Sequence, residues 1–167
     1  MKSEDLQITA LEGGYSVTVS GRANFDYAVP LRDLAGKLTP GDWLQIDLSD
    51  CEAMDSTFMG VLTMLALKLR KNGSPQLQLL GVSEMLQKLL RDLGVAKLFK
   101  FVLEGESVSG GESVSVTANN SMLTTAETVA EAHRTLVEAD RSNAEKFKQV
   151  IEFADQDVAR LKKESGE

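Results

Sequence analysis

The residues most capable of chemistry in this sequence are Asp55, Ser56 and Thr57, which stand where an apolar strand pattern gives way to a helix pattern. The strand pattern covers residues 43–48, a short acidic loop follows, and the helix pattern begins at Ser56. A hydroxyl at a helix N-terminus faces free backbone N–H groups and the positive end of the helix dipole. Both features stabilise a phosphate, so this position suits reversible phosphorylation of a surface hydroxyl.

Other interpretations of the same residues remain open. Asp55 and Ser56 are common N-cap residues, worth about 1 kcal/mol to any helix, and capping alone would explain them. Ser56 could also be a hydrolase nucleophile, but the only histidine, His133, lies far along the sequence, and no lysine in the motif replaces it as a base. We therefore expect no enzyme activity, catalytic residue or cofactor. We also expect no metal site, because no dedicated ligand spacing occurs among the acidic residues Asp47, Asp50, Glu52 and Asp55.

Composition limits the classes of function further. The chain has 167 residues, 43% of them hydrophobic, which suits one domain with an appendage. Its formal net charge of -7 argues against nucleic-acid binding, which needs a basic surface. The sequence shows no signal peptide and no apolar run near the ~20 residues of a membrane-spanning helix. The single cysteine, Cys51, excludes an internal disulfide and is expected to pack as a small apolar side chain. The expectation is a cytoplasmic protein that is not inserted in a membrane.

The first hundred residues alternate between strand and helix patterns. Period-two alternation marks the strands, and three-four spacing of apolar residues marks the helices. A strand, a helix and a further strand in succession imply a parallel crossover. The order β-β-α-β-α-β-α-β predicts an α/β domain over residues 1–104. Its segments are a hairpin at 6–20, a helix capped by Asn24 or Asp26, a strand at 43–48, a helix at 56–71, a strand near 77–80, a helix capped by Ser83, and a short strand near 99–102.

The remainder divides into a linker and a helical extension. Residues 105–121 are rich in glycine and serine and are expected to be a linker; residues 113–117 could form a weak strand. Residues 122–167 carry apolar or small side chains at three-four spacing, the pattern of helices.

The extension is expected to be two helices rather than one coiled coil. Asp140 would fall on a core position of a continuous heptad pattern, and Ser142 with Glu145 has the spacing of a capping box. We place the helices at about 122–140 and 143–163, with His133 partly buried on a helix face. The two helices could pair with each other, dock on the domain, or form a homodimer.

The residues around Ser56 also resemble a known family. Met54-Asp55-Ser56-Thr57, followed by an apolar residue and Gly60, is similar to the Asp-Ser-Ser/Thr-Gly-Leu-Gly motif of STAS domains, the domains of bacterial anti-sigma factor antagonists. Gly21-Arg22-Ala23-Asn24 stands where family members carry a Gly-Glu-apolar-Asp turn. The segment 80–101, with Ser83-Glu84, Leu89-Leu90 and Gly94, resembles the family's closing helix and strand. The resemblance covers about residues 5–103.

The resemblance implies a mixed β-sheet with helices packed on one side, and a non-enzymatic, protein-binding function in transcription regulation. In the antagonist class, a serine kinase that is itself the anti-sigma factor phosphorylates the hydroxyl after the motif Asp, which is Ser56 here, with Thr57 as the fallback. The unmodified antagonist binds the kinase and frees the sigma factor, and a serine phosphatase resets the switch. Some relatives are instead unphosphorylated adaptors in signalling or lipid-transport assemblies. The implied partner-binding residues are Asn24, Asp55, Ser56, Thr57, Phe58 and Met59.

Three residues depart from the family pattern. Phe58 replaces a glycine, which puts a bulky side chain in the first helical turn, where the docking surface is expected. Asn24 replaces an aspartate and Arg22 a glutamate. These two changes alter the charge near Ser56.

Overall fold

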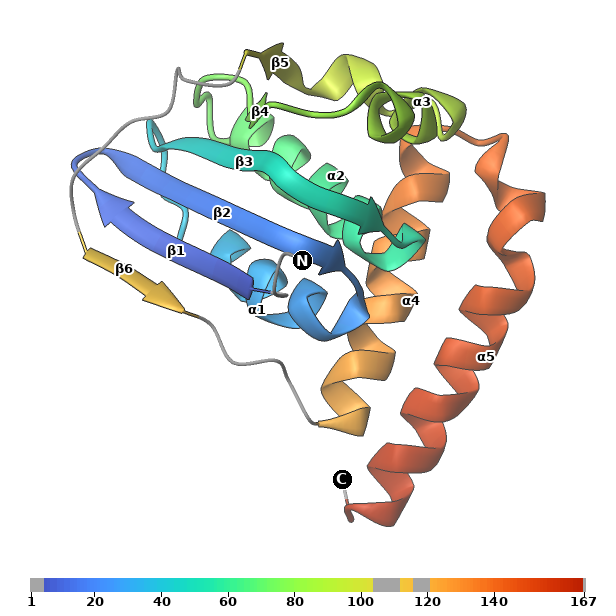
Figure 1. The fold of residues 1–167 in the computed structure, drawn as a ribbon. Helices are drawn as coiled ribbons and strands as arrows, with labels where there is room; N and C mark the ends of the chain where they lie inside the picture. Colours follow the sequence, from blue (N-terminus) through green and yellow to red (C-terminus); the bar gives the residue numbers. More distant parts are fainter. Residues whose placement is uncertain (1–4, 104–111, 116–120, 167) are drawn as a thin grey trace.

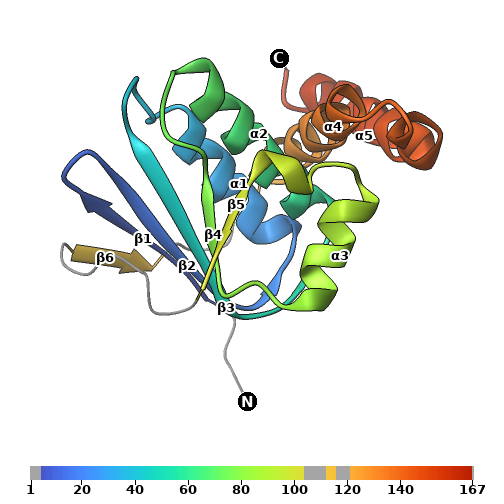
Figure 2. The same ribbon diagram turned by 90° about the horizontal axis from the view of Figure 1, so that it is seen from above.

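A computed structural model describes residues 5–103, 112–115 and 121–166 of the chain. Its centre is a six-stranded sheet in the order β5-β4-β3-β2-β1-β6, with the helices on one face (Figures 1 and 2). The α/β class and the mixed sheet expected from the sequence are confirmed. The elements of the first domain are β1 (Asp5–Leu11), β2 (Gly14–Ala23), α1 (Phe25–Ala35), β3 (Trp43–Met54), α2 (Ser56–Lys71), β4 (Gln78–Leu80), α3 (Glu84–Asp92), a 3-10 turn (Ala96–Leu98) and β5 (Lys100–Val102).

The sheet combines a hairpin with parallel crossovers. β1 and β2 are antiparallel, and Gly13 in their tight turn has a φ of 77°. β2 and β3 run parallel, as do β3 with β4 and β4 with β5, because a helix or a longer connection separates each pair along the chain. The carboxyl ends of β2 and β3 therefore meet at one edge of the sheet, where Ala23 pairs with Met54.

One strand lies inside the predicted linker. Glu112–Ser115 forms β6, which pairs antiparallel with β1 and places Val114 opposite Ile8. The sequence interpretation favoured a linker here because glycine and serine dominate the surrounding residues. Apart from residue 121, the rest of the 105–121 segment lies outside the described residues.

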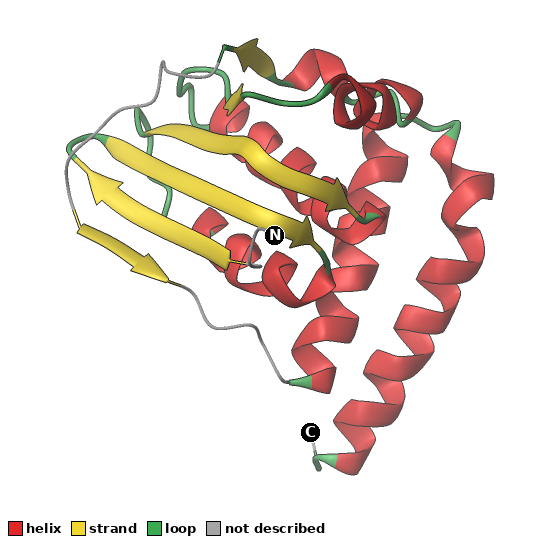
Figure 3. Cartoon of the chain, in the orientation of Figure 1, coloured by secondary structure: helices red, strands yellow, loops and turns green. Residues whose placement is uncertain are grey.

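The C-terminal extension consists of the two predicted helices, α4 (Met122–Ala139) and α5 (Asn143–Glu164), joined by a short turn (Figure 3). The predicted capping box does not form. Ser142 Oγ instead donates to Asp140 Oδ1 at 2.7 Å, and Ser142 makes no side-chain cap to α5. No helix among the described residues is long and apolar enough to cross a membrane.

The extension forms a third layer of the same core. Seen from above, α1 and α2 lie between the sheet and the α4–α5 pair (Figure 2). Ala132 and Leu136 of α4 and Phe147 of α5 belong to the apolar cluster that also contains Phe58 and Leu62 of α2. The extension is therefore packed against the domain rather than held away from it.

Candidate functional site at the start of α2

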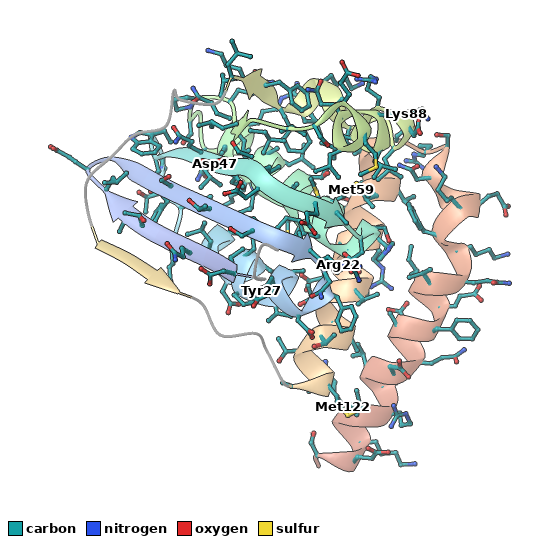
Figure 4. All side chains as sticks on the ribbon, viewed as in Figure 1. Arg22, Tyr27, Asp47, Met59, Lys88 and Met122 are labelled. Carbon is teal, nitrogen blue, oxygen red and sulfur yellow. The ribbon has the colours of Figure 1, made fainter. Side chains whose placement is uncertain are left out.

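Two helix starts lie together at the edge where β2 and β3 end. Asn24 caps α1, its Oδ1 accepting from the Asp26 N–H at 2.9 Å. Asp55 caps α2, its Oδ1 accepting from the Phe58 N–H at 2.8 Å, and its own N–H donates to the Ala23 carbonyl at 3.1 Å. Ser56 is thus the first residue of α2. Figure 4 shows the labelled side chains of Arg22 and Met59 in this region.

The hydroxyl of Ser56 contacts the C-terminal extension. Ser56 Oγ lies 2.7 Å from Nε2 of His133, in the middle of α4. The other ring nitrogen of His133, Nδ1, lies 2.7 Å from the carbonyl oxygen of Val129. A carbonyl only accepts, so Nδ1 carries the proton and Nε2 of the neutral ring accepts from the Ser56 hydroxyl. The ring of Phe147 packs edge-on against the imidazole, with centroids 4.8 Å apart, and holds its orientation.

Burial shifts the pKa of both ionisable groups at the site, His133 and Asp55. It lowers the pKa of His133, against the opposing effects of the Val129 carbonyl and the Asp55 carboxylate. Burial raises the pKa of Asp55, partly offset by the backbone N–H groups of Phe58 and Phe25. The lowered pKa of His133 favours the neutral imidazole at pH 7, the form that accepts from the Ser56 hydroxyl.

We expect the stability of the chain to fall on mild acidification. The pKa of His133 is lowered from 6.5 in the folded chain, so the unfolded chain takes up the proton first. The free energy of unfolding should be fully retained above pH 6.5 and should decrease as the pH falls through the folded-state pKa. Urea titrations across this range measure the change. His133 is the chain's only histidine, so His133→Gln should flatten the dependence.

Asp55 acts with the opposite sign. Its pKa is raised from 3.8, so its favourable contribution is complete below pH 3.8 and is lost as the pH rises through its folded-state pKa. An unchanged pH dependence in His133→Gln would contradict the assignment of the effect to the imidazole.

α4 covers the start of α2 through close and polar contacts. A Cβ atom on Gly60 would lie only 2.5 Å from the backbone oxygen of Ala132, so the two helices touch there. Arg32 of α1 donates two hydrogen bonds to the carboxylate of Glu131, from Nε at 2.8 Å and from Nη2 at 2.7 Å. A third guanidinium nitrogen donates to Thr128 Oγ1 at 3.2 Å.

The predicted partner-binding residues differ in how exposed they are. Asn24, Asp55 and Ser56 are half-buried, whereas Thr57 and Met59 are buried. Phe58 is fully buried in the core, because the third position of α2 faces the interior. This differs from the expectation that Phe58 could lie on the docking surface. In this conformation, α4 contacts the Ser56 hydroxyl, so a partner would reach this hydroxyl only beside α4.

The Ser56–His133 pair has the geometry of an activated serine, in which a base within hydrogen-bonding distance receives the hydroxyl proton. This contact removes the objection that the only histidine is distant in sequence. Two features still separate the pair from a hydrolase site. A backbone carbonyl, rather than a carboxylate, orients the imidazole, and the groove of about 600 Å³ between α1, α4 and α5 is lined by Val129 but not by Ser56.

No group of three or more metal-ligating side chains gathers within the described ranges. Cys51 is buried as expected, and burial raises the pKa of its thiol. Neither observation adds a reactive group to the site.

His133 is the site residue whose role the sequence interpretation missed. It stands on an α4 face that otherwise buries mainly small or apolar side chains, among them Ala130 and Leu136. A buried imidazole needs a hydrogen-bond partner, and this requirement was the signal available in the sequence. The identity of that partner depends on how α4 docks, which the sequence pattern left open.

Comparison with known proteins places the first part of the chain. Residues 8–104, more than half of the chain, match the family described as "Mlab, STAS domain". The chain belongs to the STAS domain family. The matched residues include Ser56 and end before α4, so His133 lies outside the family match. None of the curated proteins is significantly similar to the chain.

Solved structures with similarity to this STAS protein include three of low sequence identity. The unphosphorylated anti-sigma factor antagonist SpoIIAA is 15% identical, with a TM-score of 0.45 over 52% of this chain and 81% of that one. A putative anti-sigma factor antagonist from Thermotoga maritima is 14% identical, with a TM-score of 0.49 over 59% and 86%. An uncharacterized protein with a SpoIIAA-like fold from Shewanella loihica is 17% identical, with a TM-score of 0.40 over 64% and 90%.

Proposed function

We propose that this STAS protein is an anti-sigma factor antagonist, a cytoplasmic, non-enzymatic module that binds a partner protein and is switched by phosphorylation of Ser56. The partners would be a serine kinase that is also the anti-sigma factor and a serine phosphatase. The position of Ser56 is the observation that carries the proposal: it is the first residue of α2, directly after the capping Asp55, within the STAS match. Thr57, the fallback acceptor, is buried and so less accessible to a kinase.

The surroundings of Ser56 give a phosphate a large effect. A phosphoserine carries about -1.5 to -2 charges at neutral pH. Here it would meet the lone pair of a neutral imidazole, His133, 2.7 Å from the hydroxyl oxygen, and the adjacent Asp55 carboxylate. The positive end of the α2 dipole would favour the phosphate, but the Phe58 N–H is already bonded to Asp55 and the packing against α4 would oppose the phosphate. Modification should therefore change what can rest on this surface without disturbing the sheet.

Phosphopeptide mapping tests the proposal. The full chain is incubated with its cognate kinase and ATP, and the modified residue is identified by mass spectrometry. We expect phosphate on Ser56, with Thr57→Val as the control that leaves the label in place. Absence of label from both Ser56 and Thr57 would exclude the switch.

Binding assays test the consequence. Ser56→Asp replaces the hydroxyl that donates to His133 with a negative charge. This variant should therefore bind the kinase more than about tenfold less tightly. Ser56→Ala should bind the kinase whether or not ATP is present. Equal affinity for the Asp and Ala variants would contradict a charge-dependent switch.

The packing of α4 over Ser56 favours a second candidate function, that of an adaptor that is not phosphorylated. Its hydroxyl is already hydrogen-bonded, and α4 lies across the surface that a kinase would use. An unphosphorylated STAS adaptor in a signalling or lipid-transport assembly would need no access to Ser56. In that case the partner would bind α5 at the groove between α1, α4 and α5, which the exposed Phe153 lines. Phe153→Ser would then weaken binding, whereas Ser56→Asp would leave it unchanged.

A further inference from the structure

We propose that the face of α1 and α2 beneath α4 is a docking surface for a partner helix, and that α4 is the chain's own competitor for that surface. This inference rests on the proposed function, because it names how the same site is occupied and what its partner looks like. α4 shows the chemistry that the surface accepts, since it is itself a helix seated there.

The surface offers contacts of three kinds at neighbouring points. Gly60 leaves room for a helix backbone to touch α2, and only a small residue such as Ala132 fits opposite it. Arg32 offers a guanidinium that binds a carboxylate with two hydrogen bonds, now occupied by Glu131. Ser56 offers a hydroxyl that donates to an acceptor on the same helix.

These contacts define the partner. Glu131, Ala132 and His133 are consecutive, so a single helical turn meets all of these features, and Leu136 adds one apolar anchor a turn later. A competing helix should therefore present an acidic residue, a small residue and a hydrogen-bond acceptor in one turn, followed by an apolar residue. A basic helix would be repelled by Arg32.

The contacts of α4 with α1 and α2 are weak enough for another helix to replace it. Its buried residues are mostly small or polar, and Leu136 is the only large aliphatic side chain among them: Ala126, Thr128, Ala130, Ala132, His133 and Leu136. α2, by comparison, buries Phe58 and several leucines. Stabilisation by burial grows with apolar area, so α4 is held less firmly than α2. Its ion pair is also partly exposed to solvent.

Phosphorylation would act on this competition directly. Because α2 and α4 touch at Gly60 and Ala132, and Ser56 Oγ lies 2.7 Å from His133, no space for a phosphate on Ser56 exists between the two helices. A phosphate would replace the hydroxyl donor that His133 now accepts from and would displace α4. The same charge would repel a partner helix that presents an acceptor and a carboxylate, so the exposed face would not bind it, in keeping with the loss expected for Ser56→Asp. In the unmodified chain, the fraction of molecules with α4 unseated would set the apparent affinity for the partner.

A peptide in trans tests the docking surface. The probe is a fluorescein-labelled synthetic peptide of residues 121–142, titrated against the full-length chain and its charge variants. In Glu131→Arg, the chain's own α4 is repelled by Arg32 while the α1–α2 face stays native, so this variant should bind the peptide at least about tenfold more tightly than the parent. Arg32→Glu also releases α4 but destroys the carboxylate site, so it should not show this gain.

Matched controls keep the result specific. The double variant Arg32→Glu with Glu131→Arg restores the ion pair in reverse and should bind the peptide as weakly as the parent. A peptide carrying Glu131→Arg should bind Arg32→Glu. Circular dichroism checks that each variant is folded, and Glu131→Ala replaces Glu131→Arg if the reversal unfolds the chain. The proposal would be overturned if the parent and Glu131→Arg bound the peptide with equal affinity. It would also be overturned if Arg32→Glu and Glu131→Arg did so.

This test fails independently of the proposed function. Suppose that Ser56 is phosphorylated but the Glu131→Arg chain does not bind the peptide. The phosphorylation switch would then stand, and only the role of α4 as a competitor would be rejected. If the peptide binds but Ser56 is not phosphorylated, the docking surface would stand and regulation by a kinase would be rejected.

Discussion

Replacing Gly60 by alanine should lower the free energy of unfolding by about 1–3 kcal/mol, the usual cost of overpacking. In an exposed helix the same change would raise stability by about 0.5–1 kcal/mol, because alanine is the better helix former. The sign reverses here because the new Cβ would lie 2.5 Å from a backbone oxygen of α4 and 2.7 Å from the Cβ of Ala132. Urea denaturation of the two proteins gives the difference.

Gly36 supplies the matched control. It ends α1 with a φ of -72°, which any residue adopts, and a Cβ there would meet its nearest atom at an ordinary 3.6 Å. Gly36→Ala should therefore be neutral or slightly stabilising. A stabilising effect of Gly60→Ala would show that α4 does not rest on α2 in solution.

Replacing Asn143 by alanine should lower the free energy of unfolding by about 1–3 kcal/mol, because it leaves a buried acceptor without a donor. The Asn143 side chain is completely buried, and its Nδ2 donates at 2.9 Å both to the carbonyl of Leu93, after α3, and to that of Leu136 in α4. It thereby ties the turn between α4 and α5 to the STAS domain. The Leu136 carbonyl keeps a second donor, the Asp140 N–H, so most of the loss should fall at Leu93.

The neighbouring Ser142 is the control for Asn143. Its hydroxyl is exposed and bonds only locally to Asp140, so Ser142→Ala should change stability by less than about 1 kcal/mol. Thermal denaturation of both variants measures the contrast. Equal small effects would contradict a structural role for Asn143 in seating the hairpin.

Local signals in the sequence were sufficient for most of the STAS domain. Asn24, Asp55 and Ser83 cap the helices that their positions predicted, and period-two alternation located the strands. These signals work because capping and sheet alternation depend on residues close together in the chain. These local signals did not predict β6, because a short strand at the edge of a sheet is specified by its neighbour, β1, more than by its own composition.

The candidate site was only half predictable for the same reason. Asp55 and Ser56 are adjacent, and their motif identified the hydroxyl and its cap. His133 is 77 residues further along the chain and reaches Ser56 only because α4 docks on α2. The small residues Gly60 and Ala132 set that docking geometry, and small residues give no strong periodic signal. The sequence therefore showed which hydroxyl to consider but not what covers it.

Phosphorylation of Ser56 is expected to decide whether α4 stays on the face formed by α1 and α2. Hydrogen–deuterium exchange on the full chain with phosphoserine installed at position 56 during translation, compared with the unmodified chain, tests this claim most directly. The claim predicts that backbone amides of α4 exchange more than about tenfold faster in the phosphorylated chain, while those of β2 and β3 keep their protection. Identical protection of α4 in the two forms would contradict it.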